Sequence, residues 1–373
     1  MSALKSMPES AGKATGKSAT ESTRESSPRL SRGASLGGKR PLSGTNFLLV
    51  FTIALFVVMY AAGMIIFREQ GFANPQMFLN LFISNAGLIV ISLGLTTVMI
   101  TGGIDISVGS VTALVCMVAA YSMERQGMSA YAAIGLSLLI GLAFGIVQGY
   151  LVAYLEIQPF IVTLAGMFFG RGMTAVVSQE MIAIKNETFL AWAKFRINLP
   201  FGSYNSKGDF QQAYIYPTVV VALIALAVVF VVLKYTKFGR SLYAIGGNPQ
   251  SALMMGINVR RSKFGAYVMC GLLAGIGGFL FCLNSAAGFV EQAKFLEMDA
   301  ISSSVIGGTL LSGGVGNPIG TLFGVLIKGT ISSLITTQGT LSSWWVRIVL
   351  SALLCFFIVL QSIIAIRKAK RHD

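Results

Sequence analysis

The chain of 373 residues is 54% hydrophobic and only 11% charged, with a mean hydropathy of +0.73. Soluble proteins carry about a quarter charged residues, so this composition excludes an ordinary soluble protein and indicates an integral membrane protein. The net charge of +14 lies in three basic segments, residues 1–45, 234–263 and 367–373. We interpret these segments as signals that fix the membrane topology and favour contact with anionic lipid. We do not interpret them as a nucleic-acid-binding surface.

Residues 1–45 are rich in Ser, Gly, Lys and Arg, which predicts a disordered basic cytoplasmic tail. Within it, residues 11–18 nearly match the phosphate-binding pattern G-x-x-x-x-G-K-[ST]. Ala11 replaces the first Gly and no strand precedes the segment, so we expect no nucleotide site there. Any ATP hydrolysis would then belong to another chain.

Four apolar runs in the first half, residues 46–67, 78–101, 131–155 and 160–178, are long enough to cross a bilayer core of ~30 Å. The run at 111–121 is too short, so its helix must begin inside the Gly-rich segment 102–110. Gly residues there permit a backbone break, and Asp105 or Ser107 can cap the restarted helix. An Asp inside an apolar stretch is costly and is a functional candidate. The alternative is a short cytoplasmic turn that Asp105 caps.

Small residues recur every four positions in the fourth and fifth runs, which predicts closely packed helices. They are Gly141, Gly145 and Gly149, followed by Gly166 and Gly170. Arg171, near the far end of the fifth run, is expected to snorkel outward.

The loop at 179–213 has nearly balanced charge, which predicts an external location and a surface for an external partner. After the apolar run 214–233, the loop at 234–263 carries six basic residues and no acid, which predicts a cytoplasmic location. The two loops therefore place a membrane crossing between them.

A short helix is predicted within the basic loop. Asn248 can serve as its N-cap, Pro249 suits its first position and Gly256 can end it. Such a helix would expose apolar side chains to a cytoplasmic partner, namely Ala252, Leu253, Met254 and Met255. The alternative is a solvated loop whose helix rests on the membrane surface.

The second half continues with apolar runs at 264–283, 319–337 and 344–366, and with a short run that breaks at 307–318. The sequence thus predicts an all-α polytopic membrane protein with about ten transmembrane helices in a domain spanning 46–366, and a basic cytoplasmic tail at 367–373. Five spans per half would make the halves inverted repeats. The breaks near 102–110 and 307–318 are expected in corresponding places, which points to a binding site between the repeats.

Three stretches together, residues 102–110, 248–263 and 299–320, resemble the ribose/galactose-type monosaccharide permeases of ATP-binding-cassette importers. The similarity covers roughly residues 46–366, and within the family the chain looks most like the second permease of a galactofuranose-type importer. The resemblance implies a bacterial cytoplasmic (inner) membrane protein with both termini in the cytoplasm. It also implies three partners: an ATP-binding subunit that holds ATP and Mg, an extracytoplasmic sugar-binding protein, and a second permease copy or paralogue. It makes residues 248–261, with Arg260 and Arg261, the coupling helix that rests on the ATPase.

On this reading the chain is a non-enzymatic subunit that gives a sugar an alternating path inward. The candidate residues along the path are polar side chains and aromatic rings that could stack on a sugar: Asn85, Asp105, Ser107, Gln148, Phe160 and Phe168. For the apolar and aromatic residues, the alternative role is packing between helices. No metal site is expected, because the four Cys lie in apolar runs and the only His is His372.

Two other function classes remain open at this stage. An ion-coupled secondary transporter of a small polar solute needs ionisable relays inside the membrane, and it leaves the basic loop without a role. The candidates for such relays are Asp105, Glu156, Arg171, Lys328 and Arg347, several of them near span ends. A membrane-embedded enzyme needs a clustered nucleophile, acid and base, which the sequence does not offer.

Overall fold

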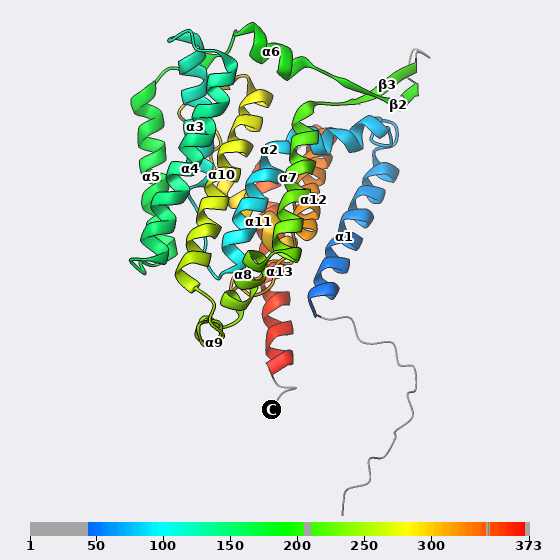
Figure 1. Cartoon of the computed structure of the whole chain (residues 1–373). Helices are drawn as coiled ribbons and strands as arrows, with labels where there is room; N and C mark the ends of the chain where they lie inside the picture. The colour runs from blue at the N-terminus through cyan, green and yellow to red at the C-terminus, as the bar shows by residue number, and fades with distance from the viewer. Residues whose placement is uncertain (1–43, 205–209, 341, 343, 370–373) are drawn as a thin grey trace, which may run out of the picture. The chain divides into compact units, whose positions relative to one another are not determined.

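The computed structural model describes residues 44–204, 210–340, 342 and 344–369 (Figure 1). The phosphate-loop-like segment at 11–18 lies outside the described residues. So do nearly all of the predicted N-terminal tail and the last four residues of the predicted C-terminal tail.

The first half contains five helices: α1 (Gly44–Ile66), α2 (Pro75–Ile100), α3 (Val108–Glu124), α4 (Ala130–Ala153) and α5 (Pro159–Val177). A segment of mixed structure follows, with β1 (Ile182–Ala183), α6 (Glu187–Lys194), β2 (Ile197–Tyr204) and β3 (Phe210–Ile215). Strands β2 and β3 form an antiparallel hairpin.

The second half contains α7 (Pro217–Tyr235), α8 (Lys237–Gly247), α9 (Pro249–Met254), α10 (Val259–Ser285), β4 (Ala287–Gly288), α11 (Leu296–Ile306), α12 (Pro318–Gln338) and α13 (Trp344–Ala369). Five helices, α2, α5, α7, α9 and α12, begin at a Pro, whose fixed φ and missing N–H suit a first turn. Eight of the described helices are long and apolar enough to cross a membrane, and α3 is a shorter apolar helix. The short α11 carries two acidic residues and three Ser, so the count of about ten transmembrane helices stays a prediction. The all-α polytopic fold is confirmed.

Helices α2 and α10 form the centre of the bundle. They run antiparallel. Gly87 of α2 lies against Gly277 of α10, whereas Gly94, two turns later on α2, lies against Cys270, which comes earlier on α10. In each of these two helices 67% of an 18-residue apolar stretch is buried, compared with 17% in α1 and in α13. A helix that is apolar on all sides suits this central position, since it has no polar face to turn toward water.

The two halves repeat the same neighbour relations. Helix α4 packs on α10 as α12 packs on α2, and α3 contacts α5 as α11 contacts α13. The equivalent helices α2 and α10 are antiparallel, which an inverted repeat requires. The first helices break the pattern, because α1 packs on α12 whereas α7 packs on α2.

The predicted close packing of small residues is confirmed on α4. A Cβ added at Gly141 would overlap the carbonyl oxygen of Gly271 and would lie 2.8 Å from the Cα of Gly275. The backbones of α4 and α10 are therefore in direct contact, which only small residues on both sides allow.

Both predicted helix breaks are present. Helix α2 ends at Ile100, and Gly102 takes a φ of +79° before α3 starts; Gly308, Gly313 and Gly314 also have positive φ in the break between α11 and α12. The expectation that the two breaks occupy corresponding places is wrong. The first follows the second helix of its half, and the other follows the third helix of its half.

The true counterpart of the first break is the connector at 286–295, between α10 and α11. Its left-handed backbone lies at Ala286, Ala293 and Phe295, with φ of 47°, 54° and 68°. No Gly occupies these three positions, so the Gly pattern in the sequence did not reveal this break.

Candidate functional site

The two short helices begin next to each other inside the bundle. A Cβ at Gly109, in the first turn of α3, would lie 3.2 Å from the backbone nitrogen of Glu297, in the first turn of α11. Helix α3 lies beside α10, with Asp105 near Cys270. Cys270 is about 16 Å along α10 at ~1.5 Å per residue, so α3 restarts deep within the bundle.

Asp105 is a buried acid at this restart, with 2% of its surface exposed. Its Oδ1 accepts hydrogen bonds from the backbone nitrogen of Ser107 at 2.9 Å and from the Ser107 hydroxyl at 2.7 Å. The thiol of Cys270 lies 3.5 Å from its Oδ2. Burial at this depth disagrees with the alternative of a short cytoplasmic turn that Asp105 caps. Ser107 occupies the N-cap position of α3 but makes no capping bond with its side chain, so Asp105 organises the start of the helix.

Three of the predicted path residues meet here. The Nε2 of Gln148, on α4, donates to the Ser107 hydroxyl at 2.8 Å, which links Gln148 to Asp105 through Ser107. The Oε1 of Gln148 is buried and has no hydrogen-bond partner among the described residues. An unpaired buried acceptor is costly, so this cluster has unused capacity to bind a donor.

The other three predicted path residues do not join this cluster. Asn85 is buried between α2 and α12, where its Nδ2 donates to the carbonyl of Leu81 and lies against Gly329. Phe160 and Phe168 are exposed on α5, at 48% and 65%. Their proposed role as stacking faces stays a prediction.

The short helix α9 has the predicted ends. The Asn248 side chain accepts from the backbone nitrogen of Ser251 at 2.9 Å, Pro249 is the first residue, and Gly256 follows the helix with a φ of +79°. Sequence alone sufficed here because capping is local.

The exposed face of α9 consists of three adjacent large side chains. Leu253, Met254 and Met255 are 64%, 90% and 68% exposed. The expectation that Ala252 shares this face is wrong, because Ala252 is fully buried. One side of the short helix must pack on the protein, and α9 packs on α8.

An ion pair borders this surface. The Nη2 of Arg260, in the first turn of α10, lies 2.9 Å from Oε1 of Glu156, in the turn between α4 and α5. Both side chains are mostly exposed, so solvent screens the pair and its contribution to stability is small. A cavity of about 720 Å³ lies beside it, lined in part by Leu253 and Arg260. The backbone N–H of Arg261 donates a hydrogen bond to Oδ1 of Asn258.

Glycines connect α8 to both helix breaks. We call Gly102, Gly246, Gly247, Gly313 and Gly314 the glycine junction. A Cβ at Gly246 would overlap the carbonyl oxygen of Ile100 and the nitrogen of Gly314, and one at Gly313 would lie 2.7 Å from the nitrogen of Gly102. The end of α8, the end of α2 and the break before α12 thus touch through backbone alone.

Two hydrogen bonds fasten this junction. The backbone nitrogen of Gly314 donates to the carbonyl of Ile100 at 2.8 Å, and the Tyr243 hydroxyl donates to the carbonyl of Gly316 at 2.9 Å. Burial raises the pKa of Tyr243 to about 12, so its hydroxyl remains a donor at neutral pH. The sequence analysis missed the junction, although the pair Gly246–Gly247 before Asn248 was a visible signal.

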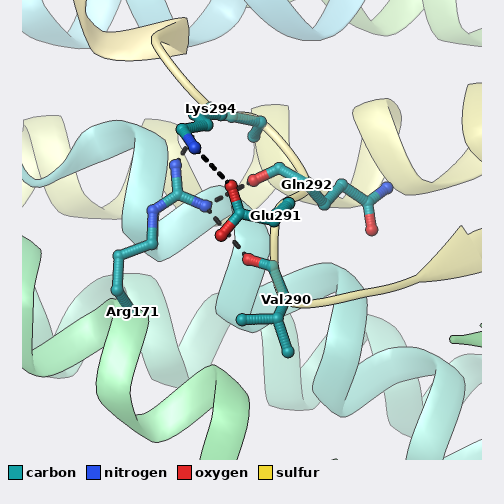
Figure 2. A network of polar contacts seen from close by, with 6 residues as sticks. Arg171, Val290, Glu291, Gln292 and Lys294 are labelled. Carbon is teal, nitrogen blue, oxygen red and sulfur yellow. Dashed lines mark hydrogen bonds and ion pairs between the residues drawn. The ribbon is translucent and has the colours of Figure 1, made fainter. Parts of the chain in front are cut away.

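Arg171 holds the connector at 286–295, as Figure 2 shows. Its guanidinium donates to the backbone carbonyls of Val290, Gln292 and Ala293. The sequence did not predict these backbone partners of Arg171, which accept from its Nη1 and Nη2. The expectation that Arg171 snorkels outward stays a prediction. Beside it, Lys294 hydrogen-bonds Glu291 at 2.6 Å and lowers the pKa of that exposed carboxyl.

Comparison with known proteins identifies the family. The family described as "Branched-chain amino acid transport system / permease component" matches residues 77–358. The inner membrane ABC transporter permease protein YjfF of Escherichia coli is 40% identical over 317 residues, which are 85% of this chain and 92% of that protein. The fructose import permease protein FruG of Bifidobacterium longum is 30% identical over 313 residues, 83% of this chain and 88% of that protein.

The ribose import permease protein RbsC of Escherichia coli is 33% identical over 277 residues, 73% of this chain and 81% of that protein. No solved structure matches the chain. The family match covers most of the bundle, from α2 to α13, and the three relatives align over 92%, 88% and 81% of their own length. The chain is therefore a multi-pass membrane protein that belongs to the monosaccharide permease family of ABC transporters.

Proposed function

We propose that this chain is the membrane subunit of an ATP-driven importer that carries a monosaccharide across the cytoplasmic membrane. The observation that supports it best is α9, a short capped helix with three adjacent exposed apolar side chains, Leu253, Met254 and Met255. An exposed patch of this kind marks an interaction surface. Relatives whose names specify fructose, ribose and galactose import support a sugar as the solute.

The proposed mechanism passes motion from a partner ATPase to the two helix breaks. The ATPase, which holds ATP and Mg, would push on α9 and α8. Backbone contact at the glycine junction leaves no side chain to absorb the displacement, so the ends of α2 and α12 would move with α8. The ion pair between Arg260 and Glu156 would carry part of the same motion to the turn between α4 and α5.

The remaining parts of the proposal concern the other partners. An extracytoplasmic sugar-binding protein would dock on the segment 179–213, which forms the β2–β3 hairpin and α6 at the end of the bundle opposite α9 (Figure 1). A second permease, either a copy or a paralogue, would complete the transporter in the lipid bilayer.

A double substitution tests the ATPase contact. Leu253→Asp together with Met255→Asp should lower the affinity for the partner ATPase by at least about a hundredfold, because each buried apolar side chain contributes about 1.5–3 kcal/mol. The charges would add a desolvation penalty. The measurement is co-purification of the ATPase and sugar-stimulated ATP hydrolysis in proteoliposomes.

The matched control is Met128→Asp, which places a negative charge on another exposed methionine, just before the end of α4 that is remote from α9. It should leave association and hydrolysis unchanged. Wild-type association of the double variant would refute the coupling role of α9. Sugar uptake that needs only a proton or sodium gradient, without the ATPase, would establish the secondary transporter instead.

A further inference from the structure

A polar pocket lies between α2 and α12, toward the ends of these helices that are remote from α9. Its volume is about 380 Å³, within the range of about 300–1,000 Å³ typical of small-molecule sites. We call it the α2–α12 pocket. Its polar lining consists chiefly of Asn80, Ser84, Asn85, Lys328, Ser332 and Thr336.

The lining comes from two facing polar stripes on helices that are otherwise apolar. Asn80 and Ser84 are four residues apart on α2, as are Lys328, Ser332 and Thr336 on α12. Residues four apart share one helix face. Both helices are long and apolar enough to cross a membrane, and polar groups on such helices are expensive against lipid. The stripes are therefore suited to a polar occupant.

The pocket continues toward the β2–β3 hairpin. A neighbouring cavity of about 240 Å³ shares Asn80 with it and is lined by Gln76, Gln211 and Gln212. Gln76 is fixed by the backbone of Tyr214, which donates to its Oε1 at 2.8 Å and accepts from its Nε2 at 3.2 Å. Amide and hydroxyl groups thus line an approach from the hairpin to Lys328.

An ion pair lies at the pocket wall. The Nζ of Lys328 is 3.3 Å from Oδ2 of Asp299, on α11, and the two side chains are 20% and 28% exposed. The lysine has three donors, and Asp299 engages one of them. Since the pair is neutral overall, it offers hydrogen bonds without selecting an anion or a cation.

Deeper between the same helices lies a chain of hydroxyls. The Oγ1 of Thr96 is 2.8 Å from Oγ1 of Thr321 and 3.1 Å from Oγ of Ser304. One turn away on α2, the Ser92 hydroxyl is fully buried and has no partner among the described residues. Beyond the pocket, the seam between α2, α11 and α12 thus continues as buried hydroxyls, one of them with unused hydrogen-bonding capacity.

We propose that the α2–α12 pocket binds a neutral polyhydroxylated molecule of monosaccharide size. Sugar hydroxyls both donate and accept, as the facing amides and hydroxyls require, and the neutral ion pair matches an uncharged ligand. The inference deepens the proposed function, on which it rests, by giving the solute a specific binding place in this chain.

Protection from labelling tests the site. Ser332→Cys is made in a Cys355→Ala background, because Cys355 is the exposed native cysteine among the described residues. A membrane-impermeant maleimide is applied to the assembled transporter with D-ribose, D-galactose or D-fructose. At saturation, at least one sugar should slow labelling fivefold or more. Met128→Cys, also exposed and in the turn between α3 and α4, should label at the same rate with or without sugar.

A second variant separates binding from folding. Lys328→Gln with Asp299→Asn keeps the pocket neutral and polar but removes the ammonium and carboxylate. It should raise the sugar concentration for half-protection at least fivefold, while assembly with the ATPase stays as in the wild type. Unchanged protection would overturn the role of the ion pair in binding.

The outcomes distinguish this inference from the proposed function. ATP-dependent sugar uptake with no protection at Ser332→Cys would reject the pocket and leave the function intact. Failure of the wild-type assembly to take up any of the sugars would reject the function. Protection that equimolar betaine reproduces, or a disulfide between two Ser332→Cys copies, would show a general solute effect or a subunit interface and would also reject the pocket.

Discussion

At the scale of single residues, the buried acid Asp105 and the cation Arg171 have the same task. Each holds backbone that does not form a helix, Asp105 through the amide of Ser107 and Arg171 through three carbonyls of the connector at 286–295. Charged groups are costly in an apolar bundle unless their hydrogen-bonding capacity is used. The sequence identified Asp105 because an isolated acid in an apolar run stands out. It did not reveal the partners of Arg171, which come from a segment about 120 positions further along the chain.

Asp105→Ala should impair uptake more than Glu156→Ala. The first substitution leaves the Ser107 amide unsatisfied in a buried place, at a cost of about 1–3 kcal/mol, whereas the second breaks an exposed, screened ion pair. Uptake by proteoliposomes with equal amounts of each variant measures the difference. Normal uptake by Asp105→Ala would reduce the site to a passive turn.

Arg171→Met should loosen the connector, because three carbonyls lose their donor at once. Hydrogen exchange at residues 289–294 should accelerate at least tenfold. The control is Arg68→Met, at an exposed position in the turn after α1. Unchanged exchange in the Arg171 variant would mean that the β1–β4 pairing and the hydrogen bonds of the Gln292 side chain hold the connector without Arg171.

At the scale of elements, local signals were enough for some features and not for others. The boundaries of α9 followed from Asn248, Pro249 and Gly256, since caps act within one turn. The left-handed residues of the connector, such as Ala286, could not be predicted, because tertiary contacts impose that conformation on residues that disfavour it. The glycine junction likewise depends on which helix ends meet.

Gly246→Ala should uncouple or destabilise the transporter, whereas Gly247→Ala should be tolerated. The added methyl group at Gly246 would overlap backbone atoms of Ile100 and Gly314, but at Gly247 it meets open space. Backbone atoms yield less readily than side chains, so we expect a loss of at least 2 kcal/mol or about tenfold in coupled uptake. Thermal unfolding and ATP-driven uptake of the two variants measure the contrast. Equal unfolding temperatures and equal uptake of the two variants would contradict the proposed role of the glycine junction in coupling.

At the scale of the whole molecule, hydropathy predicted the all-α membrane fold, and the family resemblance agreed with it. It could not predict which polar residues gather, because the rotation of each helix is set by its neighbours. Gln148 did meet Ser107, yet Asn85 lies in a different place, between α2 and α12. Neither the α2–α12 pocket nor the pairing of Lys328 with Asp299 was visible before the helices were packed.

The orientation of the bundle is a further prediction. Ser203→Cys, on the hairpin, should react with an impermeant reagent added outside cells, and Ser251→Cys, on α9, should react only after permeabilisation. The reason is the excess of basic residues around α9. The reaction is followed in the Cys355→Ala background. The reverse pattern would invert the topology and remove the ATPase contact.

The short length of α11 has a consequence for how the chain is made. Its 11 residues span about 16 Å, too little to be retained by a bilayer as an independent segment. Helix α11 packs on α12, and the ammonium of Lys328 on α12 pairs with Asp299, so a stable position of α11 in the bilayer depends on α12. The two segments would enter the bilayer as a hairpin, each lowering the insertion cost of the other's charge. Membrane insertion of α11 and α12 is then concerted, and a destabilising substitution in α12 should first prevent the insertion of α11.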